Sequence, residues 1–159
     1  MGALYRILSL LDKLTPAETV HAHCDIPCGI YDPHLAQMAA HTVIRMTILI
    51  SETADTHKIA RLTAVKEEHA ELCKKEIRIL WGDYFKHEHV EKYPELHELV
   101  WVAMKLASQA RQEVNMKAAE DLLETVNKIA SIFWQTKGIE TAAAKAPYPT
   151  KKETVYPKL

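Results

Sequence analysis

Four long stretches of this chain repeat apolar residues at the spacing of an α-helix, and this periodicity constrains the fold more than any other feature. The stretches cover roughly residues 33–55, 56–82, 94–112 and 115–138. Because short polar connections separate them, consecutive helices are expected to run antiparallel. We therefore predict an all-α fold, an antiparallel up-down-up-down four-helix bundle, over residues 33–138.

Local signals mark where these helices begin and end. Asp32 is predicted to cap the first helix, and Asn115 is a candidate cap for the fourth. Glycine weakens or closes helices, so Gly82 and Gly138 are predicted to end the second and the fourth. The polar segment 86–93 is interpreted as a connection between helices.

The side chains of the first helix are assigned to an inner and an outer face from their spacing. Leu35, Met38, Ala39 and Val43 belong to its predicted inward stripe. Cys73, in the second helix, is predicted to be a small buried hydrophobic residue. The histidines outside these patterns are assigned to the surface or to caps: His34, His41, His57, His87, His89 and His97.

Composition supports a helical, globular protein and excludes some partners. The chain of 159 residues holds four glycines and is 48% hydrophobic. Its formal net charge of −1 gives no overall field for binding nucleic acid. No apolar run approaches the roughly 18 residues that span a membrane. We expect no nucleic-acid or membrane partner.

The two ends of the chain differ from the bundle. Residues 1–22 contain the short apolar run 7–11 and match a secretory signal poorly, so we expect a cytoplasmic location. We interpret 1–22 as a leader that a protease removes; a short amphipathic helix belonging to the fold is the alternative. Residues 139–159 are rich in proline and lysine and are predicted to form an extended or disordered tail.

A thiol-rich stretch precedes the first helix and has the donors of a metal site. If the chain is cut before His23, the new amine, the Cys24 amide nitrogen and the Cys24 sulfur form two adjacent chelate rings, and Cys28 adds a second sulfur. Two nitrogens and two thiolates in a plane suit Ni(II) or Cu(II) better than zinc. The His23 imidazole is a possible axial ligand. The spacing alone leaves a disulfide or part of a zinc site as alternatives.

Four segments of the sequence resemble the nickel superoxide dismutase family: HCDIPCGIYDP (23–33), LWGDYFK (80–86), EKYPELH (91–97) and IFWQTK (132–137). The resemblance implies one nickel ion per subunit, held by a nickel hook at residues 23–32. It also implies a homohexamer of four-helix bundles and a protease that exposes His23 by removing the leader. The implied reaction converts superoxide to oxygen and hydrogen peroxide by Ni(II)/Ni(III) cycling.

The resemblance also suggests roles for individual residues. The metal ligands would be His23, Cys24 and Cys28. Tyr31 would stand over the open face of the metal and Tyr84 would lie nearby, while Lys86 would favour the approach of an anion. Asp25 would hold the hook through backbone hydrogen bonds, and Pro27 would correspond to a cis-proline.

Two positions depart from the family pattern. Better-known members hold the hook histidine with a glutamate on the first helix, paired with an arginine on the second. Here these positions are Ala39 and His69. His69 either contacts the hook directly or is a histidine satisfied within the core, and water is a further candidate for the space beside Ala39.

A different class of function follows if the leader is retained. His23 then has no free amine, so the planar set of donors is incomplete. The chain would in that case be a nickel- or copper-binding protein, or a thiol-redox protein, built on a helical bundle.

Overall fold

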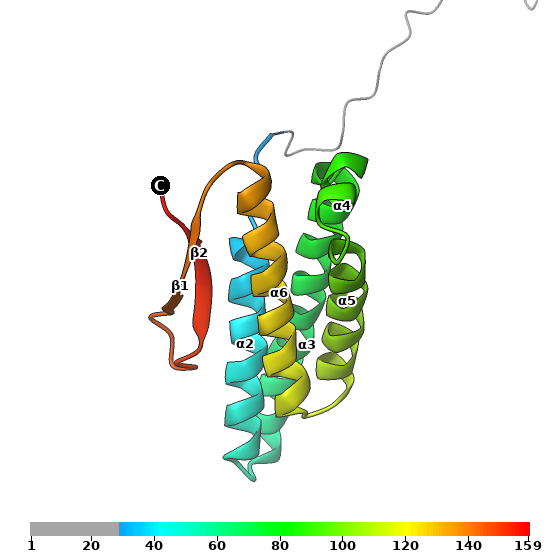
Figure 1. Cartoon of the computed structure of the whole chain (residues 1–159). Helices are drawn as coiled ribbons and strands as arrows, with labels where there is room; N and C mark the ends of the chain where they lie inside the picture. Colours follow the sequence, from blue (N-terminus) through cyan, green and yellow to red (C-terminus); the bar gives the residue numbers. More distant parts are fainter. Residues whose placement is uncertain (1–28) are drawn as a thin grey trace, which may run out of the picture.

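The computed structural model describes residues 29–159, and Figure 1 shows the arrangement of their helices and strands. The predicted leader and residues 23–28 of the predicted hook lie outside the described residues, and among them are the predicted site residues His23, Cys24, Asp25, Pro27 and Cys28.

Four long helices form the predicted bundle: α2 (His34–Ser51), α3 (Thr56–Ile79), α5 (Leu96–Gln112) and α6 (Met116–Thr136). Each packs against the next along the chain, and α6 returns to pack against α2. The ring of four antiparallel helices is thus closed, and the predicted fold is confirmed. None of the described helices combines the length and the apolar character needed to span a membrane.

Side-chain caps begin the helices close to the predicted residues. Asp55 accepts hydrogen bonds from the backbone N–H groups of the first turn of α3, and Asn115 Oδ1 accepts one from Ala118 N–H at 3.0 Å. Helix α2 starts at His34 with Pro33 at its N-cap position and no side-chain cap, so the prediction that Asp32 caps this helix was wrong by one residue; Asp32 Oδ1 accepts the His34 N–H at 2.7 Å. At each of these three helix starts, a polar side chain that is close in sequence accepts a backbone N–H of the first turn.

Small side chains allow the helices to pack closely, and one lysine lies among them. The buried core contains many alanines, including Ala36, Ala40, Ala70, Ala103, Ala107 and Ala119. Lys66 is fully buried, and its Nζ donates to three backbone carbonyls at the end of α5. Those carbonyls lack partners within their own helix, so the lysine satisfies them. Desolvation lowers the Lys66 pKa.

The chain does not leave helical structure at Gly82, which corrects the sequence prediction. After Ile79 it widens into a π-helical turn, η1 (Leu80–Tyr84), in which Phe85 N–H donates to Leu80 O at 2.9 Å. The segment predicted to be a plain connection contains a short helix, α4 (His87–Lys92). Gly138, by contrast, has φ +72° and follows the end of α6 as predicted.

The C-terminal tail is an antiparallel β-hairpin, formed by β1 (Thr141–Lys145) and β2 (Glu153–Pro157). The hairpin lies along α2 and α6 of its own bundle (Figure 1). This tail was predicted to be an extended or disordered segment, without regular structure. The sequence analysis missed the hairpin.

Two side-chain amides of the bundle form hydrogen bonds with the edge of β2 that does not pair with β1. Gln37 Nε2 donates to Val155 O at 3.0 Å, while Asn127 Nδ2 donates to Glu153 O at 3.0 Å and Asn127 Oδ1 accepts from Val155 N–H at 3.3 Å. The amides also bond to each other at 2.9 Å. They replace the neighbouring strand that this edge lacks.

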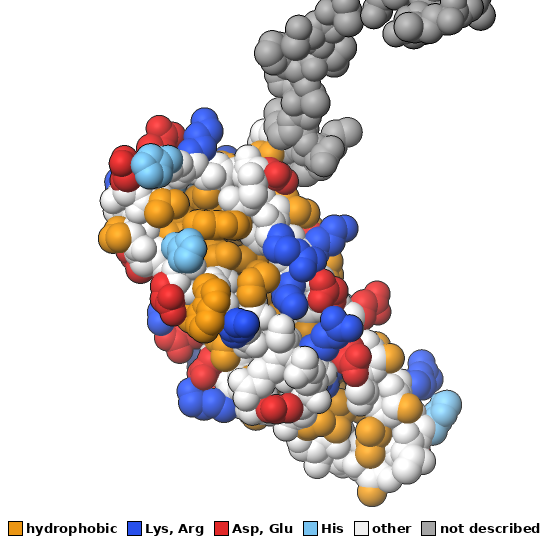
Figure 2. Space-filling model, turned by 90° about the vertical axis from the view of Figure 1, so that its right-hand side faces the viewer, with side chains coloured by type: hydrophobic (Ala, Val, Ile, Leu, Met, Phe, Trp, Pro, Cys, Tyr) orange, Lys and Arg blue, Asp and Glu red, His pale blue; other side chains and the backbone are white. Residues whose placement is uncertain are grey.

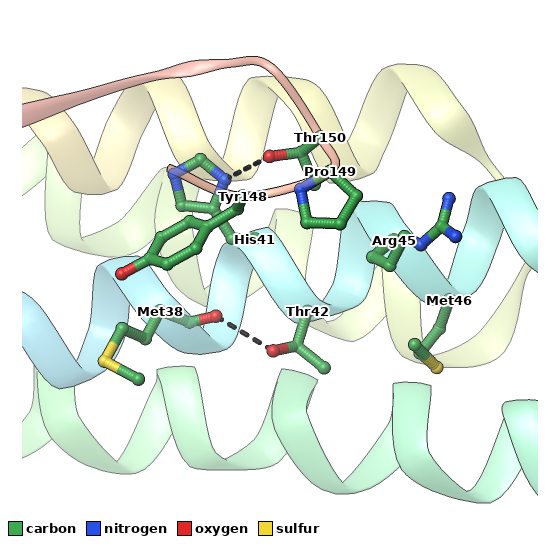
Figure 3. Close-up of a pocket in the computed structure, with 8 residues that line it drawn as sticks. All are labelled: Met38, His41, Thr42, Arg45, Met46, Tyr148, Pro149 and Thr150. Atoms are coloured by element: carbon green, nitrogen blue, oxygen red, sulfur yellow. Dashed lines mark hydrogen bonds between the residues drawn. The ribbon is translucent and has the colours of Figure 1, made fainter. Parts of the chain in front are cut away.

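His41 anchors the hairpin loop, so its assignment to the surface or to a cap was wrong. Its side chain lies under the loop (Figure 3), and the residue is 4% exposed. Nδ1 lies 2.8 Å from Thr150 Oγ1, and Nε2 lies 2.6 Å from Thr154 Oγ1. The Tyr148 ring packs edge-on at 5.0 Å. Because the hairpin covers this side of α2, a polar residue is buried there.

The predicted inward stripe of α2 was partly wrong, because the hairpin covers a second side of this helix. Leu35 is 52% exposed and Met38 is 43% exposed, whereas Ala39 and Val43 are buried as predicted. Helix α2 is covered on two sides, by the bundle and by the hairpin. A single apolar stripe could not indicate both contacts.

Stability is predicted to fall as the pH drops, because His41 is buried in its neutral form. Desolvation, with a smaller effect from His34, lowers its pKa from 6.5 to about 4. Between these values the unfolded chain binds more protons, so stability that is complete above pH 6.5 declines toward pH 4. Between pH 7 and 5 the expected loss is about 2 kcal/mol.

Urea unfolding at pH 7 and pH 5 measures this loss. A His41→Gln variant keeps a polar side chain but cannot titrate, so its free energy of unfolding should vary less with pH by about that amount. Equal pH dependence in the two proteins would contradict the prediction.

Candidate metal centre and its surroundings

The predicted ligands directly precede the end of the bundle at which α2 begins. The C-terminal ends of α3 and α6 lie at this same end of the bundle, because consecutive helices run in opposite directions (Figure 1). Within residues 29–159, no three His, Cys, Asp or Glu side chains gather in a way that could hold a metal ion.

Tyr31 and Tyr84, both predicted site residues, are brought together at this end. Their ring centroids lie 5.5 Å apart with an interplanar angle of 55°. A groove of about 250 Å³ runs beside Tyr31, between the start of α2 and the end of α3, and Ile30, Leu35 and Ile79 are among its lining residues. Two positions that are more than fifty residues apart in sequence thus share one site.

The hydroxyl of Tyr84 has a defined hydrogen-bond direction. Its oxygen lies 2.6 Å from Thr136 Oγ1, and Thr136 Oγ1 donates to Phe133 O at 2.6 Å. The single threonine proton is used in that second bond, so the Tyr84 O–H donates to Thr136. The Tyr84 oxygen therefore keeps its lone pairs as acceptors toward any molecule that enters the site.

Positive charge and aromatic rings surround Tyr84. The ammonium group of Lys137 lies 5.3 Å from the Tyr84 ring centroid, and exposed Lys86 follows two residues after the tyrosine. The His89 ring stacks on Tyr84 at 5.6 Å, and the Phe133 ring lies at 4.5 Å. This arrangement can attract a small anion and hold the tyrosine in place.

The sequence analysis missed three of these neighbours: Thr136, Lys137 and His89. Antiparallel topology carries a usable signal for the first two, because the end of the fourth helix must lie near the end of the second. His89 was assigned to the surface or to a cap, and it does accept the Lys86 N–H at the start of α4, but its contact with Tyr84 depends on a short helix in a segment that has no apolar periodicity.

The two departures from the family pattern have different environments. Ala39 is buried in the core and brings no polar atom. His69 is half-buried, and its Nδ1 lies 2.9 Å from Val65 O in its own helix. A carbonyl can only accept, so Nδ1 carries a proton there. This bond agrees with the interpretation of His69 as a satisfied histidine; contact with the hook involves residues outside the described range.

Cys73 is buried and takes no part in the site. Its thiol is free of any disulfide, and desolvation, together with the nearby Glu76 carboxylate, raises its pKa to about 12. A thiol held in its neutral form is a poor nucleophile and a poor metal ligand. The prediction of a small buried hydrophobic residue is confirmed.

Comparison with known proteins decides the family. The model of the family described as nickel-containing superoxide dismutase matches residues 18–137. The chain belongs to this family. The match ends before β1, so the C-terminal hairpin of this nickel superoxide dismutase family member lies beyond it.

Individual relatives support the same assignment. Superoxide dismutase [Ni] of Streptomyces coelicolor is 43% identical over 129 residues, which cover 80% of this chain and 98% of that protein. The protein of the same name from Streptomyces seoulensis is 42% identical over equal shares. A solved native structure of nickel superoxide dismutase matches with a TM-score of 0.69 and 42% identity, over 72% of this chain and 99% of the other.

Introducing the family's glutamate at position 39 is predicted to destabilise this chain. Ala39→Glu places a carboxylate in the core and should lower the free energy of unfolding by about 3 kcal/mol. Adding His69→Arg supplies the partner that the family pattern has and should recover more than half of the loss. Urea denaturation of the metal-free variants measures both effects.

His69→Arg alone is the matched control, because its half-buried position tolerates a long side chain that reaches solvent. If the two changes add without coupling, positions 39 and 69 do not pair, and the prediction fails.

Proposed function

We propose that the family's reaction, dismutation of superoxide at nickel, takes place in this chain where residues 23–28 meet the Tyr31–Tyr84 pair. One observation carries the assignment. The stretch that holds both remaining cysteines directly precedes Tyr31, and Tyr31 packs against Tyr84 among two lysines. The alternative of an unprocessed metal-binding or thiol-redox protein is not favoured by the family match.

The donor set of the stretch fits nickel. His23 would contribute its amine and imidazole, Cys24 its amide nitrogen and sulfur, and Cys28 its sulfur, with one ion per subunit. Bound nickel supplies the one-electron chemistry, Ni(II)/Ni(III), by which two superoxide ions become oxygen and hydrogen peroxide. Asp25 and Pro27 would shape the loop that carries these donors.

The described residues attract the substrate anion and help to supply the protons that the peroxide product needs. Lys86 and Lys137 create positive potential where a small anion arrives, and such focusing raises association rates. Tyr31 and Tyr84 narrow the approach and order water. Because the Tyr84 proton is donated to Thr136, water near Tyr84 donates to its oxygen and keeps its other proton available for the developing peroxide.

The remaining expectations concern processing, assembly and location. A leader-removing protease would expose the amine of His23 that the donor set needs. A homohexamer is supported by apolar side chains on the face that Figure 2 shows, and by Trp101, which is 53% exposed. A cytoplasmic location remains the expectation from the poor match of residues 1–22 to a secretory signal.

Nickel retention is predicted to depend on Cys28 and not on Cys73. In processed protein whose intact mass shows a start at His23, Cys28→Ser should lose nearly all nickel and activity, because a hydroxyl is a poor ligand for this metal. Cys73→Ala is the matched control and should keep both. Nickel content is measured by elemental analysis; retention by the serine variant would contradict the ligand assignment.

The hydroxyl of Tyr31 is predicted to matter for turnover or for anion selectivity. Tyr31→Phe keeps the ring contact with Tyr84 but removes the hydroxyl, so the rate per nickel should fall several-fold, or inhibition by azide should strengthen. Pulse radiolysis measures the rate. Tyr148→Phe, in the hairpin loop, is the control, and unchanged kinetics and inhibition for Tyr31→Phe would refute the role.

A further inference from the structure

His89 makes two contacts that join separate parts of the proposed substrate site. Its Nδ1 accepts a hydrogen bond from Lys86 N–H at 3.1 Å, and its ring stacks on Tyr84 at 5.6 Å with an interplanar angle of 16°. The backbone N–H of His89 donates to Lys86 O at 3.0 Å. One side chain therefore contacts both residues assigned to anion approach and water ordering.

The exposure of His89 differs from that of its neighbours in α4. Its side chain is 17% exposed, whereas those of His87 and Glu91 are 88% and 68% exposed. Phe85 packs edge-on against its ring at 5.9 Å. The imidazole is thus enclosed between α4 and the end of η1, and Val90 beside it packs against the core, whereas the other side chains of this short helix are exposed.

The contact with Lys86 closes the start of α4. Lysine has no side-chain acceptor, so Lys86 cannot cap the helix in the usual way. The His89 nitrogen takes the part of the glutamate in a capping box and satisfies the Lys86 N–H. That bond requires Nδ1 to be unprotonated, with the ring proton on Nε2.

We propose that His89 is a positioning residue for superoxide dismutation. Its side chain holds the Lys86 backbone in a fixed position relative to the Tyr84 ring. The inference rests on the proposed roles of Lys86 and Tyr84. The Lys86 side chain is exposed, so the average position of its ammonium group depends on where its backbone is held. Loss of the His89 bond would let that backbone move and would weaken the field that guides superoxide to the metal.

Two substitutions separate the functions of the imidazole. His89→Phe keeps a ring that can stack on Tyr84 but has no acceptor for Lys86 N–H. His89→Gln keeps an acceptor at the capping-box position but has no ring. His87→Phe is the matched control, because His87 lies in the same short helix and faces solvent.

The first measurement needs no metal. Amide hydrogen exchange at Lys86 should be about tenfold faster in His89→Phe than in the unsubstituted chain, and near the original rate in His89→Gln and His87→Phe. Unchanged exchange in His89→Phe would overturn the claim that His89 holds this backbone.

The second measurement uses nickel-loaded protein and the salt dependence of the rate. Lys86→Met should lower the second-order rate constant with superoxide about threefold and flatten its dependence on ionic strength. His89→Phe should shift both quantities in the same direction. Adding His89→Phe to Lys86→Met should cause little further change, because both act through the same charge.

The outcomes distinguish the two proposals. If Lys86→Met leaves the rate and its salt dependence unchanged, the proposed role of Lys86 fails, while the exchange data still decide whether His89 holds the backbone. If Lys86→Met slows the reaction and His89→Phe does not, the role of His89 alone is overturned. A purely structural residue would lower stability without altering the dependence on ionic strength.

Discussion

The site depends on one widened helical turn at the end of α3. In η1 the Phe85 N–H reaches back five residues to Leu80 O, so the turn contains an extra residue before the chain becomes extended at Phe85. Tyr84 consequently packs against Tyr31 and donates to Thr136, and Phe85 is buried. An ordinary α-helical turn would rotate these side chains to other faces of the helix.

A second constraint acts along the opposite side of α2. The free edge of β2 is completed by Gln37 and Asn127, while the two ring nitrogens of His41 contact Thr150 in the hairpin loop and Thr154 in β2. Each bond satisfies a buried polar group that would otherwise destabilise the fold. Because the hairpin holds α2 from outside while α3 and α6 hold it from inside, the start of α2 is fixed, and Tyr31 is fixed with it.

The sequence predicted what local chemistry decides and missed what tertiary contacts decide. Asn115 caps α6 by accepting an N–H only three residues ahead in the chain, so this helix start could be predicted from the sequence. His41 looked like a surface residue because its partners lie more than a hundred residues away. Tyr84 and Lys86 were found through resemblance to a family. His89 was not, since its position depends on the widened turn before it.

The state of His69 bears on how a histidine ligand can be held without the family's glutamate. Ala39 brings no acceptor, and a carboxylate in this core would carry a large desolvation cost unless it were paired. His69 uses Nδ1–H on Val65 O, which leaves Nε2 as an acceptor in the neutral ring. A neutral acceptor of this kind can receive an N–H donor without bringing a charge into the bundle. In the family pattern that the resemblance implies, each of the two charges would need the other, so Ala39 is better matched by a residue at position 69 that is not permanently charged.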